Sequence, residues 1–165
     1  MALRTILTAG DEMLQKKCRP VTAFDDRLAT LLDDMTETLL QSGGVGLAAP
    51  QVGVLRRVVV LLDINKDEEV VELVNPEVIE MNELEKTVEG CLSVPGKYGM
   101  VKRPMQVTVR YQDRGGEWHE RTAEGFTARA FCHEIDHLDG HLYTELVTEY
   151  LDPDDFTEDD EGEDQ

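Results

Sequence analysis

The stretch "HEIDH", His133 to His137, carries two histidines four residues apart, with a glutamate directly after the first. Residues four apart on a helix are neighbours, with roughly 5–6 Å between their Cβ atoms, so both imidazoles can bind one metal ion. Glu134 is turned by about 100° around the helix axis from His133, which places it beside the ion and not on it. A carboxylate there can act as the base for a metal-activated water. The pattern favours a metal-dependent hydrolase over a helix that carries two unrelated histidines.

A metal that activates water usually has three protein ligands and an open fourth position, so one more ligand is needed. The metzincin pattern requires a histidine where this chain has Tyr143. His141 lies past Gly140, where the helix is expected to end. A gluzincin would use a downstream glutamate, but Glu158 and Glu161 stand in an acidic stretch with no helical pattern. The metzincin pattern therefore fails, and the other two alternatives are weak.

The stretch "VEGCLSVPG", Val88 to Gly96, offers a better third ligand. Cys91 stands at the edge of a strand-like run, and we expect Pro95-Gly96 to form the turn that follows. A thiolate there, together with the two imidazoles, would complete a Cys-His-His site suited to Zn²⁺ or Fe²⁺.

A third stretch, "GGVGLAAPQVG", runs from Gly43 to Gly53. Gly44 and Gly46 allow a ligand to approach the backbone closely, and Gln51 offers an amide donor after a turn fixed by proline. Alone this loop is a weak signal, because glycine-rich loops after helices are common.

Two helices and several short strands are expected to position these groups. In residues 25–44 the apolar residues follow i, i+3, i+4, i+7, i+11 spacing, acids occupy the first turn, and Gly43-Gly44 ends the pattern, which predicts an amphipathic helix. A second helix is predicted from about Phe126 to Asp139 and carries the histidines. Its apolar face comprises Ala128, Phe131, Cys132, Ile135 and Leu138.

The residues between the helices are predicted to form mainly antiparallel sheet. Strand-like runs are "RRVVVLLD", "EEVVELVNP", "PEVIEMN" and "EKTVEG", and "MQVTVRYQ" and "EWHERTAE" form a hairpin through "DRGG". The layout is therefore α+β.

Composition bounds the class of protein. With 165 residues, 41% of them hydrophobic, the chain suits one domain, which we place at residues 1–151. The longest apolar run, Val58 to Leu62, is far below the ~20 residues of a membrane span, and the start of the chain has no export signal. A cytoplasmic protein is expected. Three cysteines, an odd number, argue against a disulfide framework.

Residues 152–165 contain nine Asp or Glu and no Lys or Arg, out of a formal net charge of −19. Such a block cannot bury enough apolar surface to offset its ordering entropy, so we expect a solvated acidic tail, with the binding of a basic partner as the alternative. The acidic balance and the lack of a basic stripe disfavour direct nucleic-acid binding.

Together "GVGLAAPQ", "EGCLSVP" and "HEIDH" resemble the three signature motifs of the peptide deformylase family, in the right order, and "ILTAGDEMLQKKCRPV" resembles that family's opening segment. The likeness runs from about Ile6 to about Leu146. It implies the deformylase fold, in which antiparallel sheets pack around a C-terminal metal-binding helix, with an N-terminal amphipathic helix. It also implies a hydrolase of protein biosynthesis that removes the formyl group from the N-terminal formyl-methionine of nascent polypeptides at the ribosome, a co-translational modification.

The resemblance implies roles for single residues. The metal ligands would be Cys91, His133 and His137, and Glu134 would be the general acid and base. The formyl oxygen would be polarised by the Gln51 side chain and the Leu92 backbone N–H. Cleft residues that bind the peptide backbone would be Val45, Gly46 and Gly90, and walls of the methionine pocket would be Phe126, Arg129 and Ala130. An ion pair of Glu89 with Arg103 would support the metal-binding strand.

The chain departs from the family pattern in two places. Cys132 stands where the family often has Gln, and we interpret it as a packing residue. Some relatives end in a basic helix suited to ribosomal RNA, whereas this chain is acidic there, so that mode of ribosome contact is not expected.

The resemblance favours Fe²⁺ as the physiological ion, although a thiolate with two imidazoles also accepts Zn²⁺, Ni²⁺ or Co²⁺. Two rival functions stay open on the residues: a metallopeptidase with Cys-His-His ligation, and a non-catalytic binding module of deformylase-like fold.

Overall fold

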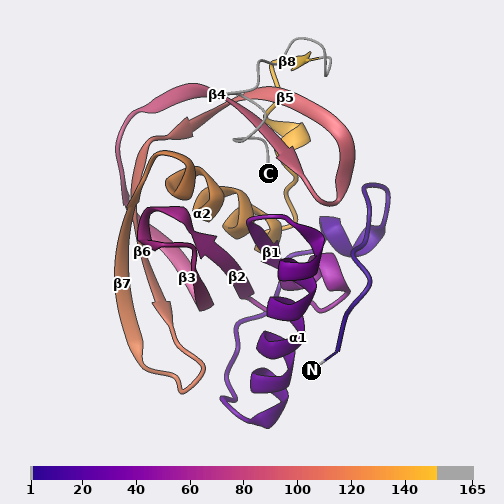
Figure 1. The fold of residues 1–165 in the computed structure, drawn as a ribbon, viewed down its shortest axis with the longest axis vertical. Coiled ribbons are helices and arrows are strands. Elements are labelled where there is room, and N and C mark those ends of the chain that lie inside the picture. Colours follow the sequence, from indigo (N-terminus) through magenta and orange to yellow (C-terminus); the bar gives the residue numbers. More distant parts are fainter. Residues whose placement is uncertain (1, 152–165) are drawn as a thin grey trace.

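The computed structural model describes residues 2–151 and has an α+β fold, as expected (Figure 1). Its helices and strands in chain order are α1 (Asp26–Ser42), β1 (Gly46–Ala48), β2 (Val58–Asp63), β3 (Glu69–Met81), β4 (Leu84–Cys91), β5 (Val94–Pro104), β6 (Gln106–Gln112), β7 (Trp118–Glu124), α2 (Gly125–Leu138) and β8 (Glu149–Leu151). Four short 3₁₀ helices are η1 (Glu12–Gln15), η2 (Ala49–Val52), η3 (Ile64–Lys66) and η4 (Tyr143–Glu145). In the part of the chain described, no helix is long and apolar enough to cross a membrane.

The strands form two antiparallel sheets. The larger has the order β1-β2-β3-β6-β7, and the smaller has the order β4-β5-β8. Helix α2 lies between them, with β4 and β5 on one side and the larger sheet on the other (Figure 1). The helix that carries the histidines is therefore enclosed by both sheets, in agreement with the predicted fold.

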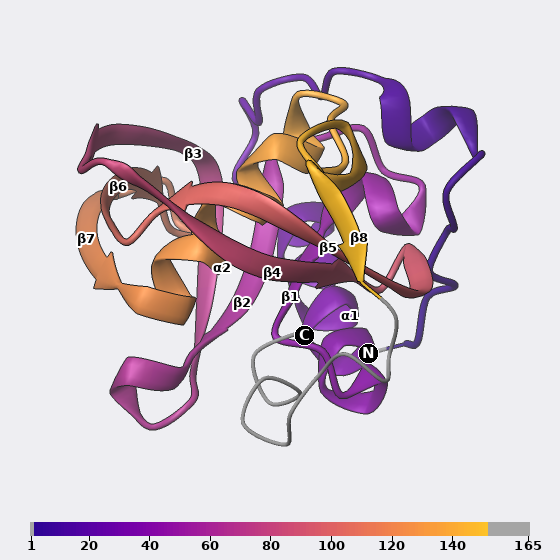
Figure 2. The same cartoon turned by 90° about the horizontal axis from the view of Figure 1, so that it is seen from above.

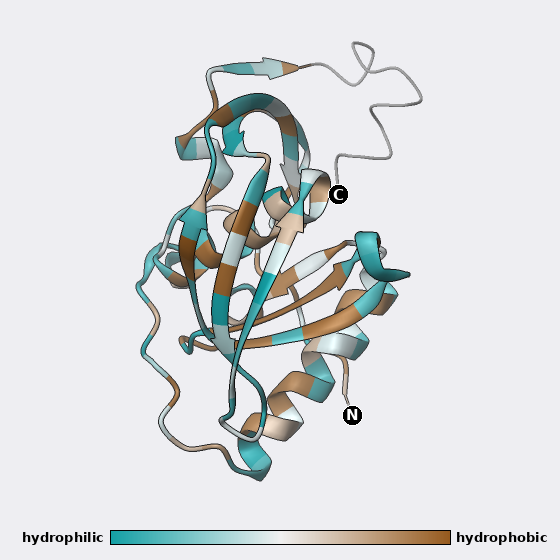
Figure 3. Cartoon of the chain, turned by 90° about the vertical axis from the view of Figure 1, so that its left-hand side faces the viewer, coloured by the Kyte–Doolittle hydropathy of each residue, from teal (hydrophilic) through white to brown (hydrophobic). Residues whose placement is uncertain are grey.

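The β1–β2 part of the larger sheet is buried on both faces, which explains the uninterrupted apolar run in β2. Because side chains alternate along a strand, Val59 and Leu61 pack in the core that faces α2, whereas Val58 and Val60 pack in the core that faces α1. Figure 3 shows hydrophobic residues along these strands and along α1. Strands β1 and β2 thus lie between the two helices.

Both helices begin and end close to the predicted positions. The Asp25 side chain accepts a hydrogen bond from the Leu28 N–H at the start of α1, and Gly43 ends it in the left-handed conformation, with φ 75°. At the end of α2, Gly140 has φ 81°, and a Cβ there would lie 2.6 Å from the Gln15 carbonyl oxygen. The predicted apolar face of α2 is buried in the core.

Two details of the strand prediction were wrong. The runs on either side of Pro76 form one strand, β3, because a register irregularity between Val74 and Glu77 absorbs the proline. Pro95-Gly96 is not a turn but part of β5, a strand that the sequence did not reveal; the tight turn joins Cys91 to Val94 instead. The acidic stretch 152–165 lies outside the described residues.

Candidate active site

Three potential metal ligands meet where β4 ends over α2. The ligand atoms of Cys91, His133 and His137 all lie within 4.8 Å of one another, and the Cys91 Sγ is 3.4 Å from the His137 Nε2. In a tetrahedral zinc-type site, with metal–sulfur and metal–nitrogen bonds of about 2.3 and 2.0–2.1 Å, sulfur and nitrogen are separated by about 3.5 Å. The donor set therefore fits a divalent transition metal.

A buried carboxylate orients the first imidazole. The His133 Nδ1 is hydrogen-bonded to Glu89 Oε1, which leaves Nε2 directed at the cluster. Arg103 donates to both oxygens of Glu89, at 2.9 and 2.7 Å, and to Asp136 Oδ2 at 2.7 Å. Burial opposes ionisation of Glu89, but His133 and Arg103 outweigh it and lower its pKa to about 2. The predicted pair of Glu89 with Arg103 is present, and it holds the ring of His133.

The electrostatics of the cluster favour a bound cation. Burial alone would lower the pKa of His133, yet the nearby charges of Cys91, Glu89 and Glu134 raise it well above its usual value. Burial, reinforced by the charge of His133, lowers the pKa of His137, so this ring is neutral and ready to coordinate. The negative charges that hold a proton on His133 would equally attract a metal ion in its place.

Glu134 lies beside the cluster and is 4% exposed. Its Oε2 is 3.9 Å from the His133 Nε2, and its buried Oε1 has no hydrogen-bond partner among the described residues. Burial raises the pKa of Glu134 to about 7. Gly46 on β1 leaves room for this carboxylate, because a Cβ at position 46 would lie 2.6 Å from Oε2. A carboxyl group of this kind can take up and release a proton near neutral pH.

Gln51 on η2 directs its amide at the same place. Its Oε1 accepts from the Ala48 N–H at 2.9 Å, which fixes the orientation of the carboxamide. Its Nε2 donates to Ser93 Oγ at 3.0 Å and lies 3.7 Å from Cys91 Sγ. The Ser93 N–H also points at this sulfur, at 3.4 Å. Two N–H groups, from the Gln51 amide and the Ser93 backbone, are therefore directed at the Cys91 sulfur.

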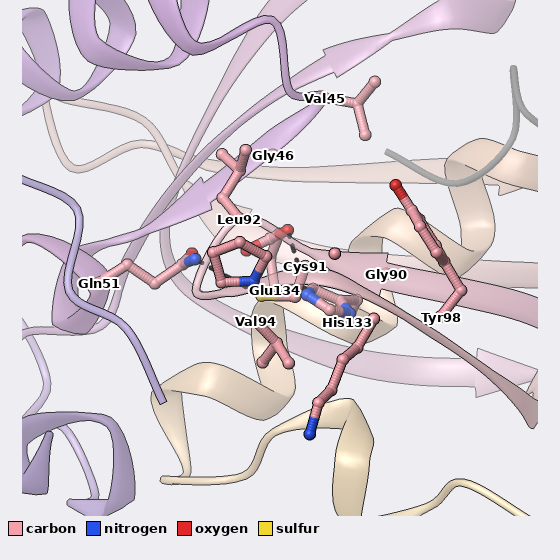
Figure 4. Close-up of a pocket in the computed structure, with 13 residues that line it drawn as sticks. Val45, Gly46, Gln51, Gly90, Cys91, Leu92, Val94, Tyr98, His133 and Glu134 are labelled. Carbon is pink, nitrogen blue, oxygen red and sulfur yellow. Dashed lines mark hydrogen bonds and ion pairs between the residues drawn. The ribbon is translucent and has the colours of Figure 1, made fainter. Parts of the chain in front are cut away.

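Apart from His137, which meets Cys91 and His133 in the ligand cluster, the predicted site residues line two adjoining pockets. The first is lined by Val45, Gly46, Gln51, Gly90, Cys91, Leu92, Val94, Pro95, Gly96, Lys97, Tyr98, His133 and Glu134 (Figure 4). The second is lined by Val45, Val88, Glu89, Gly90, Phe126, Arg129, Ala130, His133 and Glu134. In the second pocket the Arg129 guanidinium lies over the Phe126 ring, 5.1 Å from its centroid. All the residues singled out for the site are thus brought together.

His141, a weaker candidate for a ligand, lies outside the cluster, and Cys132 packs as predicted. His141 has an exposed side chain and contacts Glu145, so it is not part of the cluster. Cys132 packs in the core, and burial raises the pKa of its thiol to about 12. Glu158 and Glu161 lie outside the described residues. Of the alternatives for a third ligand, Cys91 is the one beside the histidines.

The sequence reading missed Ser93 and Tyr143. Ser93 is fully buried against Gln51 and Cys91, and a hydroxyl two residues after a cysteine was the available signal. The ring centroids of Tyr143 and His133 lie 6.0 Å apart, and the Tyr143 hydroxyl donates to the Lys97 carbonyl at 2.9 Å. That tyrosine appeared only as the failed metzincin position, and nothing local in the sequence indicated its contact with β5.

Comparison with known proteins identifies a family and several relatives that this chain resembles. The family model described as polypeptide deformylase matches residues 3–151. Peptide deformylase 2 of Clostridium acetobutylicum is 50% identical over 152 residues, which cover 92% of this chain and 99% of that protein. The crystal structure of a peptide deformylase from Legionella pneumophila has a TM-score of 0.85 and 44% identity, over 89% of this chain and 87% of that one. The peptide deformylase from Thermotoga maritima also gives a TM-score of 0.85, with 40% identity, over 90% and 99% of the two chains.

Proposed function

This chain belongs to the polypeptide deformylase family, and we infer that it removes the formyl group from the N-terminal formyl-methionine of nascent polypeptides and releases formate. The observation that carries this function is one pocket lined by Glu134, Gln51, Cys91 and His133, with the His137 ring completing the cluster of three ligand atoms. A metal-binding module without catalysis would need neither Glu134 nor Gln51.

We propose that Cys91, His133 and His137 hold one divalent ion, and that Fe²⁺ is the physiological one. The support is the donor set, since a thiolate with two imidazoles accepts Fe²⁺, Zn²⁺, Ni²⁺ and Co²⁺. When bound, such an ion supplies a water acidic enough to attack a carbonyl carbon near neutral pH. The short chain of contacts from Arg103 through Glu89 to His133 would keep the ligand ring in place.

Glu134 would move the proton in both halves of the reaction. Its buried carboxylate takes the proton from the attacking water and then delivers it to the leaving α-amine of methionine. A pKa of about 7 suits both roles, because the group exchanges a proton readily at neutral pH.

Gln51 and Leu92 would stabilise the negative charge that collects on the formyl oxygen. The Gln51 carboxamide is already held by the Ala48 N–H, so its Nε2 needs no reorientation during the reaction. The Leu92 backbone N–H is the second proposed donor. Loss of one such preorganised donor typically costs about 10²–10³ in rate.

The second pocket would receive the methionine side chain. Phe126, Arg129 and Ala130 lie on one helix face, and Val45 and Gly90 are shared with the first pocket, so the formyl group and the side chain can occupy adjoining spaces. The backbone at Val45, Gly46 and Gly90 would bind the peptide chain. Because the acyl group under attack is very small, the shape of the site can exclude ordinary internal peptide bonds.

We further propose that residues 1–151 form the catalytic domain and that the protein acts in the cytoplasm on nascent chains as they leave the ribosome, without binding nucleic acid directly. The support is the family match over residues 3–151 and the acidic composition of the chain.

Formate release from a formyl-Met-Ala-Ser peptide tests the function. Protein prepared without oxygen is compared with Glu134→Ala and with Glu120→Gln, which alters an exposed glutamate on β7 as a control, and the metal content of each sample is measured. Wild type and control should release formate, and Glu134→Ala should not, at equal metal content. Cleavage of the unformylated peptide would instead favour a metallopeptidase, and the absence of formate from the metal-loaded wild type would refute the function.

A further inference from the structure

Ser93 lies in the tight turn between β4 and β5 and is fully buried. The reaction proposed above does not use its hydroxyl. That hydroxyl accepts a hydrogen bond from Gln51 Nε2 at 3.0 Å, and the Gln51 side chain is itself buried. Ser93 therefore contacts the group that is proposed to stabilise charge on the formyl oxygen.

The Gln51 carboxamide is held at both of its ends. Its Oε1 accepts from the Ala48 N–H at 2.9 Å, and its Nε2 donates to Ser93 Oγ. The Ala48 hydrogen bond alone would leave the carboxamide free to turn about a single contact. A glutamine amide has two N–H donors, which diverge by about 120° in one plane. Because Ser93 accepts one of them, the direction of the other is fixed.

The second N–H of Gln51 is the one that a substrate can use. Nε2 lies 3.7 Å from Cys91 Sγ, and the side chain points toward Cys91 and Glu134 (Figure 4). Gln51 and Glu134 line the same pocket, in which the formyl group would react. The hydrogen bond to Ser93 thus directs the second N–H into the reaction site.

The N-terminal segment holds both partners of this hydrogen bond. The Ala9 N–H donates to the Ser93 carbonyl at 2.7 Å, and the Leu7 N–H donates to the Gln51 carbonyl at 2.7 Å. Figure 2 shows this segment, in indigo, running past the turn that joins β4 to β5. Gln51 and Ser93 are 42 residues apart in the chain, and these two backbone contacts fix their separation.

We propose that Ser93 is a positioning residue for the deformylase reaction: its hydroxyl orients the Gln51 amide so that the second N–H meets the formyl oxygen. The inference rests on the proposed function. Because Ser93 is fully buried, its effect on the substrate passes through Gln51. Charge on the formyl oxygen develops in the transition state, so loss of this orientation should lower kcat and leave KM unchanged.

The kinetic test deletes the hydroxyl in Ser93→Ala and measures kcat and KM for formyl-Met-Ala-Ser by formate release. The kcat should fall by about tenfold, which is part of the 10²–10³ that loss of a whole donor typically costs. In a double-mutant cycle, Ser93→Ala should lower kcat no further once Gln51→Ala has removed the amide. The matched control is Thr38→Val, which removes a buried hydroxyl that accepts from the Arg4 N–H at 2.9 Å on α1. Its kcat should equal that of the wild type.

Two measurements without turnover report on the amide and on the ligand sulfur. In NMR spectra of zinc-loaded wild type, the side-chain N–H signals of Gln51 can be assigned by their loss in Gln51→Ala. The N–H bound to Ser93 should exchange slowly with water, and Ser93→Ala should accelerate this exchange. In cobalt-loaded protein, the absorption band of the Cys91 thiolate should be the same with and without the hydroxyl, because the Ser93 backbone N–H, 3.4 Å from the sulfur, remains in the variant.

The outcomes separate this inference from the function beneath it. A wild-type kcat in Ser93→Ala, or an equal loss of kcat with and without the Gln51 amide, would overturn the inference and leave the deformylase activity intact. A changed cobalt band would also overturn it, because Ser93 would then act through the metal ligand. If Ser93→Ala does not fold, rapid exchange of both Gln51 side-chain N–H groups in the wild type would overturn the inference, and slow exchange of one would support it. The absence of formate from the metal-loaded wild type would overturn the proposed function itself.

Discussion

The substitution Gly46→Ala tests whether the position of the Glu134 carboxylate limits the reaction. A Cβ at position 46 would lie 2.6 Å from Glu134 Oε2, 2.8 Å from Cγ and 2.9 Å from Cδ, whereas ordinary contacts begin at 3.4 Å. To restore an ordinary contact, the carboxylate must move by roughly 0.8 Å, because repulsion rises steeply at shorter separations. Both groups are buried, so Glu134 has little room in which to move.

A misplacement of about 1 Å at a reacting group can cost about 10² in rate, so kcat should fall by about a hundredfold in Gly46→Ala. Metal content should stay the same, because the contact that the new methyl group makes is with Glu134 and not with a ligand atom. The matched control is Gly115→Ala on the β6–β7 turn, where the added Cβ meets its nearest atom at 3.4 Å. Its kcat should equal that of the wild type.

A double-mutant cycle with Glu134→Gln identifies the cause, with kcat, KM and metal content measured for all four proteins. If alanine acts by displacing the carboxylate, Gly46→Ala should lower kcat little further once that carboxylate is gone. If alanine instead blocks the peptide backbone, it should raise KM equally in both backgrounds. A metal-loaded Gly46→Ala protein with the kcat of the wild type would refute the reasoning, because the close contact would then have no consequence for catalysis.

Three further predictions concern the residue that supports a metal ligand, the identity of the metal, and the contacts of Asp34 with the N-terminal residues. Glu89→Ala should weaken metal binding by about 10–100-fold, as measured by competition with a chelator, because His133 loses the partner of its Nδ1. Protein loaded with Fe²⁺ should lose deformylase activity in air much faster than the same protein loaded with Zn²⁺, since oxygen attacks both the ion and the Cys91 thiolate; equal half-lives would contradict this. The Ala2 N–H and the Arg4 guanidinium lower the pKa of Asp34 below its ordinary 3.8. The Asp34 carboxylate therefore stabilises the folded state above pH 3.8, and this stabilisation is lost as the pH falls through the lower pKa that Asp34 has in the folded protein. The difference in urea midpoint between wild type and Asp34→Asn should be largest at about pH 5 and should shrink toward pH 2.

The helices were predictable because their signals are local. The apolar spacing of α1, its Asp25 cap and its Gly43 stop all lie within one stretch of sequence, and the same holds for the face of α2. The placement of His133, Glu134 and His137 on one helix followed from that spacing alone. Cys91 and Gln51 were found through their motifs, since spacing does not tell which distant loops a helix will meet.

The strand β5 was missed because its sequence signals conflict with its structure. Pro95-Gly96 is a strong turn signal, yet Gly96 has φ 75° within a strand that pairs with β4 for most of its length. The hydrophobic pattern of β5 is also interrupted, since one face packs on the core around Val101 while the other carries exposed residues. The contacts that Tyr143 and Ser93 make depend on this strand pairing, so they could not be read locally.

The position of Arg103 explains how segments that are distant in the sequence keep their relative positions in the site. Arg103 belongs to β5, its partner Glu89 belongs to β4, and its other partner Asp136 belongs to α2. A single buried guanidinium therefore ties the smaller sheet to the helix that carries the histidines. Removing these carboxylates would leave the Arg103 charge buried without a partner. The resulting loss of folding free energy is far larger than the net contribution of the intact ion pair. Any relative movement of the sheet and the helix is thus opposed at the place where Cys91 must meet His133 and His137.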